Sequence, residues 1–200
     1  STGDDGTVTL SEMGDTVTLG AGDISVVLTN TTTDGGSAAT TSHTITAGSG
    51  VDTFTPEGAD ASEITGFTVG TDKIRLGATA IEAIGGTMLT NGASGQVSAL
   101  TAVVIDEATT GAGFTFDTAS SVMRLSGTFA DTAAVDAELI AQMDDGGLTA
   151  NDIVLTIWND GTNAHISAID ITTLDAGNDD TVDAVLVHDL LVLMGVDHTT

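Results

Sequence analysis

TVTLSEMGDTVTLGAGD, residues 7–23, contains the same unit twice. Each copy is a short alternating run of threonine and apolar residues, followed by a turn of glycine and aspartate. Val8 and Val17 occupy equivalent positions, nine residues apart. A third copy, HTITAGSGVDTFT, spans residues 43–55. Alternation with a period of two predicts strands, and a nine-residue repeat of strand and turn predicts a parallel β-helix or β-roll.

The strongly negative charge of the chain argues against nucleic acid and anionic membranes as its binding partners. Its 200 residues include 29 acidic and 3 basic side chains, which give a net charge of −26. The basic residues Lys73, Arg75 and Arg124 are too few to form the positive surface that binds nucleic acid or an anionic membrane. Self-repulsion of this size opposes a compact fold. We therefore expect divalent cations to balance the carboxylates.

Composition nevertheless favours a folded β-protein. Hydrophobic residues make up 40% of the chain and aromatic residues only 3%, so we expect a thin aliphatic core. The chain has no cysteine, and metal or repeat stacking must therefore replace disulfides. The longest apolar region, residues 184–196, is interrupted by His188 and Asp189 and is too short to span a membrane. Because the chain starts at Ser1, we expect a processed product, a fragment, or a protein exported by a C-terminal signal.

We predict two regions, a β-roll-like region with its capping segment at 1–77 and a β-rich assembly or secretion region at 78–200. The polar segment 30–42 is expected to be an inserted loop. The first region is predicted to contain strands at 7–10, 16–19, 24–29, 43–46, 53–55, 64–68 and 73–76.

The second region is expected to add strands at 102–106, 113–116 and 122–126. A helix is predicted over 132–143, with Asp131 as N-cap and Gly146-Gly147 at its end. An Asp-Gly turn at 160–161 predicts a hairpin of 153–158 with 164–171, and Trp158 is expected in its core. Residues 185–196 are expected to form an apolar strand or helix.

The repeated Gly/Asp turns are candidates for binding calcium. This ion takes six to eight oxygen ligands from carboxylates and backbone carbonyls, and such turns supply both. The alternative is that glycine and aspartate simply favour turns. A second acidic cluster, at 170–183, does not have the spacing of an EF-hand loop. The candidate metal-binding residues are Asp4, Asp5, Asp15, Gly20, Gly22, Asp23, Gly48, Gly50, Asp52, Asp72, Asp175, Asp179 and Asp180.

Three segments resemble proteins of the repeats-in-toxin (RTX) family. AGSGVDTF, residues 47–54, is similar to the nonapeptide G-G-x-G-x-D-x-apolar-x, and GAGDISV at 20–26 is a form one residue shorter. ITGFTVGTDKIRL at 64–76 resembles the segment that follows the rolls of type I-secreted proteins. LTIWNDGTNAHISAID at 155–170 resembles the terminal hairpin of large RTX surface proteins and adhesins.

The resemblance implies a bacterial protein that is exported by type I secretion and folds outside the cell when it binds calcium. Ala47 replaces the first glycine of the nonapeptide, and Gly66 and Arg75 replace acids of the capping segment, which implies fewer ions than a full roll binds.

No catalytic motif is present, and we expect no enzymatic activity. The chain lacks the HExxH helix of zinc proteases, the G-x-S-x-G turn of hydrolases and a P-loop. His43 and His165 lie on alternating strands and are predicted to be surface residues, whereas His188-Asp189 is expected to have a structural role.

We therefore expect a mainly β, calcium-binding structural protein of the bacterial surface, assembled as a homo-oligomer, filament or layer. The alternative is a C-terminal folding and secretion module of a larger enzyme or adhesin. A domain that binds cell-surface polysaccharide is a weaker hypothesis, because so few aromatic side chains are available to stack on sugars.

Overall fold

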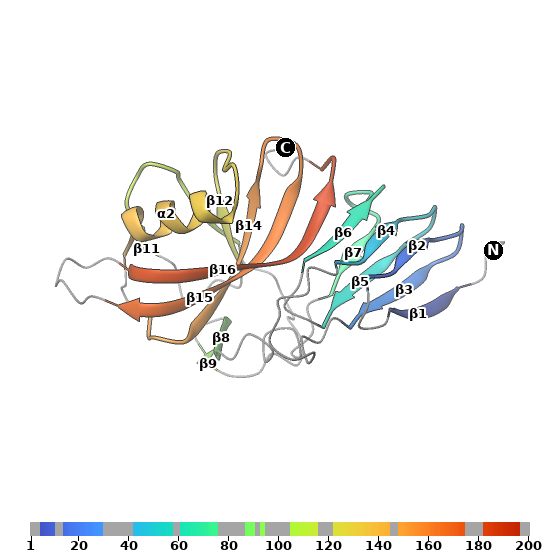
Figure 1. Cartoon of the computed structure of the whole chain (residues 1–200), viewed down its shortest axis with the longest axis horizontal. Helices are drawn as coiled ribbons and strands as arrows, with labels where there is room; N and C mark the ends of the chain where they lie inside the picture. The colour runs from blue at the N-terminus through green and yellow to red at the C-terminus, as the bar shows by residue number, and fades with distance from the viewer. Residues whose placement is uncertain are drawn as a thin grey trace.

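The chain is mainly β, as its sequence predicts, with one helix among the described residues. The computed structural model describes residues 5–10, 14–29, 42–57, 61–75, 87–90, 93–94, 105–115, 122–144, 148–174 and 182–196. The predicted loop at 30–42 falls almost wholly outside these ranges. Figure 1 shows two parts side by side, which share one long sheet.

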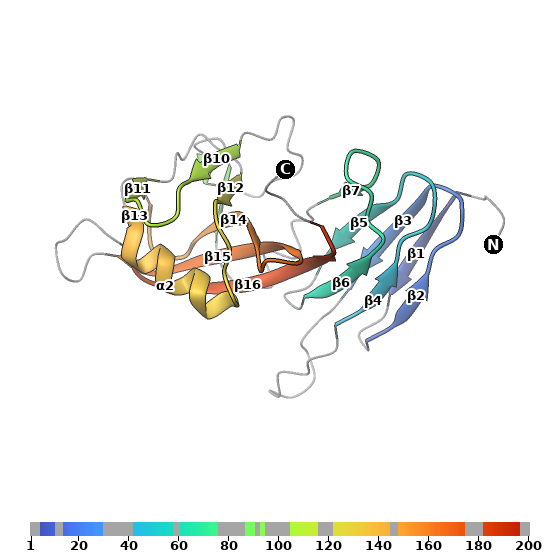
Figure 2. The same cartoon turned by 90° about the horizontal axis from the view of Figure 1, so that it is seen from above.

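Seven short strands of the N-terminal part alternate between two parallel layers (Figure 2). The chain therefore crosses from one layer to the other after each strand. We call the described residues from 5 to 75 the parallel unit. Its first layer, sheet A, has the order β1 (Gly6–Leu10), β3 (Ile24–Leu28), β5 (Thr53–Pro56) and β7 (Lys73–Ile74). Its second layer contains β2 (Thr16–Thr18), β4 (Thr44–Thr46) and β6 (Ser62–Thr65).

Alternating residues of these strands form the core between the layers. In β3 the burial alternates along the strand, with Val26 fully buried. Ile45, Phe54 and Ile64 are also fully buried, which confirms the period-two pattern of the repeats. Each strand predicted between residues 7 and 76 is present, although β6 begins two residues earlier than expected.

The C-terminal part is built on three long antiparallel strands, β14 (Asp152–Asn159), β15 (Ala164–Leu174) and β16 (Val182–Met194). The predicted hairpin is thereby confirmed, and the apolar C-terminal segment is a strand. On the other side of β14 from β15 lie three shorter strands, β8 (Thr87–Thr90), β10 (Ile105–Ala108) and β12 (Val122–Leu125). β8 and β12 pair with β14 in parallel, and β10 pairs with β12 in parallel. In addition, β9 (Ala93–Ser94) pairs with β8, and β11 (Phe114–Thr115) pairs with β13 (Met143–Asp144).

β16 joins the two parts. It pairs with β15 along its length, and its last residues, Leu191–Met194, also pair with β6 in parallel. Leu191 and Leu193 of β16, with Ala164 and Ile166 of β15, belong to the core of the parallel unit. The end of the parallel unit at β6 is thus covered by the long strands of the C-terminal part.

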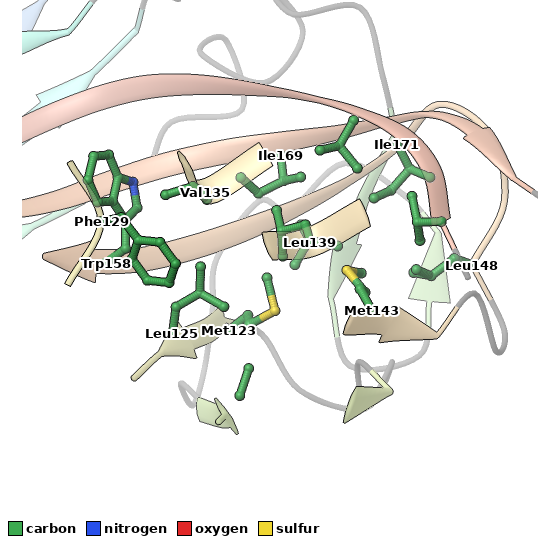
Figure 3. Close-up of a cluster of buried hydrophobic side chains, with 14 residues drawn as sticks. Met123, Leu125, Phe129, Val135, Leu139, Met143, Leu148, Trp158, Ile169 and Ile171 are labelled. Atoms are coloured by element: carbon green, nitrogen blue, oxygen red, sulfur yellow. The ribbon is translucent and has the colours of Figure 1, made fainter. Parts of the chain in front are cut away.

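The helix α2 (Thr132–Gln142) covers the opposite face of the long strands. Asp131 is its N-cap, as predicted, and its carboxylate accepts a hydrogen bond from Ala134 N–H at 2.9 Å. Val135 and Leu139 are fully buried and point into the cluster drawn in Figure 3, where Phe129 meets Trp158 edge to face. The prediction that Gly146-Gly147 ends the helix was wrong. The helix ends at Gln142, because Met143 is extended and pairs with β11.

Candidate functional site

Four aspartates lie together along one edge of the parallel unit, and we call them the aspartate ladder: Asp5, Asp23, Asp52 and Asp72. Each directly precedes a strand of sheet A. The strand register aligns Gly6 with Ile24 and Thr53 with Lys73, so the ladder consists of two in-register pairs. Ser25 lies opposite Thr53, however, and Asp23 and Asp52 are therefore offset by one residue. The shorter turn at 20–23 accounts for this offset.

Asp52 and Asp72, which we call the inner pair of the ladder, are buried and hold the turns together. Asp52 is fully buried; its Oδ2 accepts a bond from Gly48 N–H at 3.0 Å within its own turn, and its Oδ1 accepts one from Ile24 N–H at 3.1 Å. Asp72 repeats this arrangement with Thr68 N–H at 2.8 Å and Asp52 N–H at 3.0 Å. Each carboxylate thus closes its own turn and binds the neighbouring one.

Asp5 and Asp23, which we call the outer pair of the ladder, are exposed to solvent. Asp23 Oδ1 accepts a bond from Val51 N–H at 2.8 Å, and Asp5 Oδ1 accepts one from Asp23 N–H at 3.1 Å. An ionised carboxylate has about four lone-pair sites. Against the described residues, each member of the outer pair therefore keeps most of its capacity to accept bonds or to bind a cation.

The glycines of the turns allow the backbones to stack at close range. A Cβ atom added to Gly48 would lie only 1.7 Å from the carbonyl oxygen of Gly20. At Gly50, which has a φ of +143°, it would lie 2.6 Å from the oxygen of Gly22 and 3.1 Å from Asp23 Oδ1. Carbonyl oxygens of one turn therefore point toward the next turn, beside a carboxylate.

Ion pairs do not offset the charge of the ladder in the described part of the chain. Within the described residues, no lysine or arginine forms an ion pair with any of the four aspartates; Arg124 pairs with Glu107 instead, at 2.8 Å. The same part of the chain holds no group of three or more acidic or histidine side chains already arranged around a single metal position. Backbone N–H groups occupy the spaces between the carboxylates.

Of the remaining candidate metal-binding residues, only Asp15 is among the described residues, and it does not join the ladder. Asp15 lies at the opposite edge of the parallel unit, where its N–H donates to His43 Nδ1 at 3.0 Å. Asp4, Asp175, Asp179 and Asp180 fall outside the described residues. Of the sites expected from sequence, the structure brings together Asp5, Asp23, Asp52 and Asp72 with the glycines of two of their turns, Gly20, Gly22, Gly48 and Gly50.

The prediction that His43 and His165 are surface residues was wrong. His43 is fully buried because it is enclosed in the stack next to the turn that contains Asp15. Burial lowers the pKa of His43, although the Asp15 carboxylate, 3.7 Å away, acts in the opposite direction. His165 is buried because it lies opposite Trp158 in the hairpin, with the two rings stacked 3.8 Å apart.

His165 also forms a polar network that sequence reasoning missed, which we call the His165 clamp. Its Nδ1 lies 2.9 Å from Asp189 Oδ2 and its Nε2 lies 3.3 Å from Asp160 Oδ2. Trp158 Nε1 donates to Ser167 Oγ at 2.8 Å, and that hydroxyl donates to Asp189 Oδ1. Burial alone would lower the pKa of His165, but the carboxylates of Asp189 and Asp160 raise it above its ordinary value.

Comparisons with protein-family models, with curated proteins and with solved structures found no match for this chain. Among the described residues, no helix has the length and apolar character needed to cross a membrane.

Proposed function

We propose that this chain is an extracellular calcium-binding structural protein, a subunit or segment of a bacterial surface layer, filament or matrix. The observation that carries the proposal is the aspartate ladder, four carboxylates stacked on one edge in a chain with a net charge of −26. Such a stack concentrates negative charge that the three basic residues of the chain cannot balance.

The chemistry of the ladder favours calcium over other cations. Its donors are carboxylate and carbonyl oxygens, which hard cations prefer, and it lacks thiols and imidazoles. Calcium tolerates flexible geometry at 2.3–2.6 Å, whereas magnesium demands a near-ideal octahedron. The exposed outer pair, with the carbonyls of Gly20 and Gly22 facing the next turn, is the best placed part. Asp52 and Asp72 serve mainly to hold the stack together.

The proposal is tested by unfolding the protein thermally in chelator and in 10 mM calcium. Extracellular calcium sites bind with Kd values of about 10⁻⁴–10⁻³ M. At 100 times Kd, one site stabilises the fold by about 2.7 kcal/mol, which for a chain of this size raises Tm by roughly 5–11 °C.

Asp23→Asn provides the discriminating variant, because the amide keeps an acceptor for Val51 N–H but loses the charge. We expect it to lose most of the calcium-dependent shift. Glu63→Gln, an exposed carboxylate of β6 outside the ladder, serves as the control and should keep that shift. Identical melts of the parent protein in chelator and in calcium would contradict the proposal.

The alternative is a calcium-dependent folding and secretion module of a larger enzyme or adhesin. It is favoured by the way β15 and β16 complete the core of the parallel unit, so that the described residues form a self-contained fold. Light scattering during a calcium titration separates the two functions. A structural subunit assembles above a calcium threshold and dissociates in chelator, whereas a module stays monomeric.

A further inference from the structure

The alternation of side chains in β16 shifts by one residue where the strand passes from one part of the protein to the other. Ile166 lies opposite Leu191 and Ser167 lies opposite Asp189, so Leu190 is an extra residue in β16. Successive side chains of a regular strand point to opposite faces, whereas Leu190 clusters with Ala168 and Leu191 clusters with Ile166, two residues on the same face of β15. The bulge thereby delivers Leu191 and Leu193 into the core of the parallel unit.

The His165 clamp and the 160–165 turn together hold both ends of the segment that contains this bulge. At one end, Asp189 is bound by Ser167 and His165. At the other end, Gly195 N–H donates to Asn163 Oδ1 at 3.0 Å. Asn163 in turn donates to Asp160 through its backbone N–H at 2.7 Å and its side-chain amide at 2.8 Å. The 160–165 turn therefore brackets the part of β16 that pairs with β6.

The geometry of the ring fits its protonated form. Both nitrogens of His165 face carboxylate oxygens, and only an imidazolium has a proton on each nitrogen. A neutral ring would direct a lone pair at one of the two carboxylates. Within the described chain, Asp160 and Asp189 are the charged groups against the ring. Ser167 and Trp158, the other members of the clamp, are uncharged, and the indole face stabilises a stacked cation.

We propose that the His165 clamp is a pH-sensitive latch between the two parts of the protein, closed when His165 is protonated and released when the ring loses its proton. Release frees Asp189 and the 160–165 turn, and the β16–β6 pairing loses its support. The proposal does not depend on calcium binding. Because the folded-state pKa of His165 is raised, this stabilisation is fully present below pH 6.5 and is lost as pH rises through the folded value.

The test is urea unfolding of the parent protein, His165→Gln and His188→Gln between pH 6 and pH 9, in chelator and again in calcium. His188 is the matched control, because it lies in the same strand but opposite Ala168, outside the clamp. The unfolding constant of the parent should rise relative to that of His165→Gln by up to about tenfold for each pH unit above 6.5, until the folded pKa is passed. His188→Gln should follow the parent.

Two NMR measurements on the parent protein keep the test decisive if His165→Gln folds poorly. The ring of His165 should titrate above pH 6.5, and the protection factors of the amides of Leu191–Met194 should fall as it does. A ring that titrates at or below pH 6.5 would overturn the proposal. So would a stability difference between parent and His165→Gln that is the same at pH 6 and pH 9.

Discussion

Replacing Gly48 by alanine should destabilise the protein more than replacing any of the exposed glycines of its strands. The added Cβ would lie 1.7 Å from the carbonyl oxygen of Gly20, whereas Cβ atoms in proteins essentially never approach another heavy atom closer than 3.0 Å. One turn must therefore move by more than about 1 Å, and the obstacle is backbone rather than a flexible side chain. Overpacking of this kind costs about 1–3 kcal/mol.

The same displacement disturbs a hydrogen bond to the buried Asp52 side chain and one between the two turns. Gly48 N–H donates to Asp52 at 3.0 Å, and Ser49 N–H donates to Gly20 at 3.2 Å. Leaving a buried acceptor with one partner fewer costs a further 1–3 kcal/mol or so. We expect a total loss of about 2–6 kcal/mol, which corresponds to a fall in Tm of roughly 4–24 °C.

Gly6→Ala is the matched control, because a Cβ at this position meets nothing within 4 Å and the strand is at the edge of sheet A. Thermal unfolding of the parent and both variants, followed by circular dichroism at fixed calcium, measures the difference. Equal Tm values for the two variants would refute the close stacking of the turns.

Three further outcomes are expected. Leu139→Ala, at the fully buried face of α2, should cost about 2–5 kcal/mol in urea unfolding, since it leaves a cavity beneath the helix. Asp131→Ala should cost about 1 kcal/mol in the same assay, and a loss below a few tenths of a kcal/mol would show that Asp131 does not stabilise the helix as its N-cap. Burial alone would raise the pKa of Asp160, but bonds from Asn163, Thr162 and His165 lower it to about 2. Its contribution is therefore present above pH 3.8 and lost as pH falls toward 2, and Asp160→Asn should flatten that part of the acid profile.

The repeats could be predicted because their signals are local. A run in which threonine alternates with valine, isoleucine or leucine forms a strand wherever a neighbouring strand can pair with it, and the strands of the parallel unit lie at these runs. The position of Asp23 or Asp52, one residue before a strand, was likewise visible in the sequence. The shorter turn at 20–23 was visible too, but the partner of each carboxylate was not, because it depends on how that turn packs on the turn at 47–52.

The His165 clamp could not be predicted for a different reason. Its members come from a turn and three strands, and Asp189 reaches Ser167 only through the bulge at Leu190. Nothing local to His165 indicates that two carboxylates will face its ring. The one available signal was the interruption of an apolar run by Asp189, which pointed to a structural role without identifying the partner.

The end of α2 illustrates the limit of local capping rules. The helix predicted over 132–143 spans 132–142, but its end is set by the pairing of Met143 with Phe114 and not by Gly146-Gly147. A tertiary contact outweighed the propensity of the intervening residues.

Calcium binding at the aspartate ladder can be seen directly in a crystal structure of the protein grown in millimolar calcium, with anomalous scattering data. We expect an anomalous peak beside Asp23, with carboxylate and carbonyl oxygens at 2.3–2.6 Å and with Gly20 or Gly22 among the ligands. A structure in the same buffer whose ladder keeps only its backbone N–H partners, with no peak between the turns, would contradict the account.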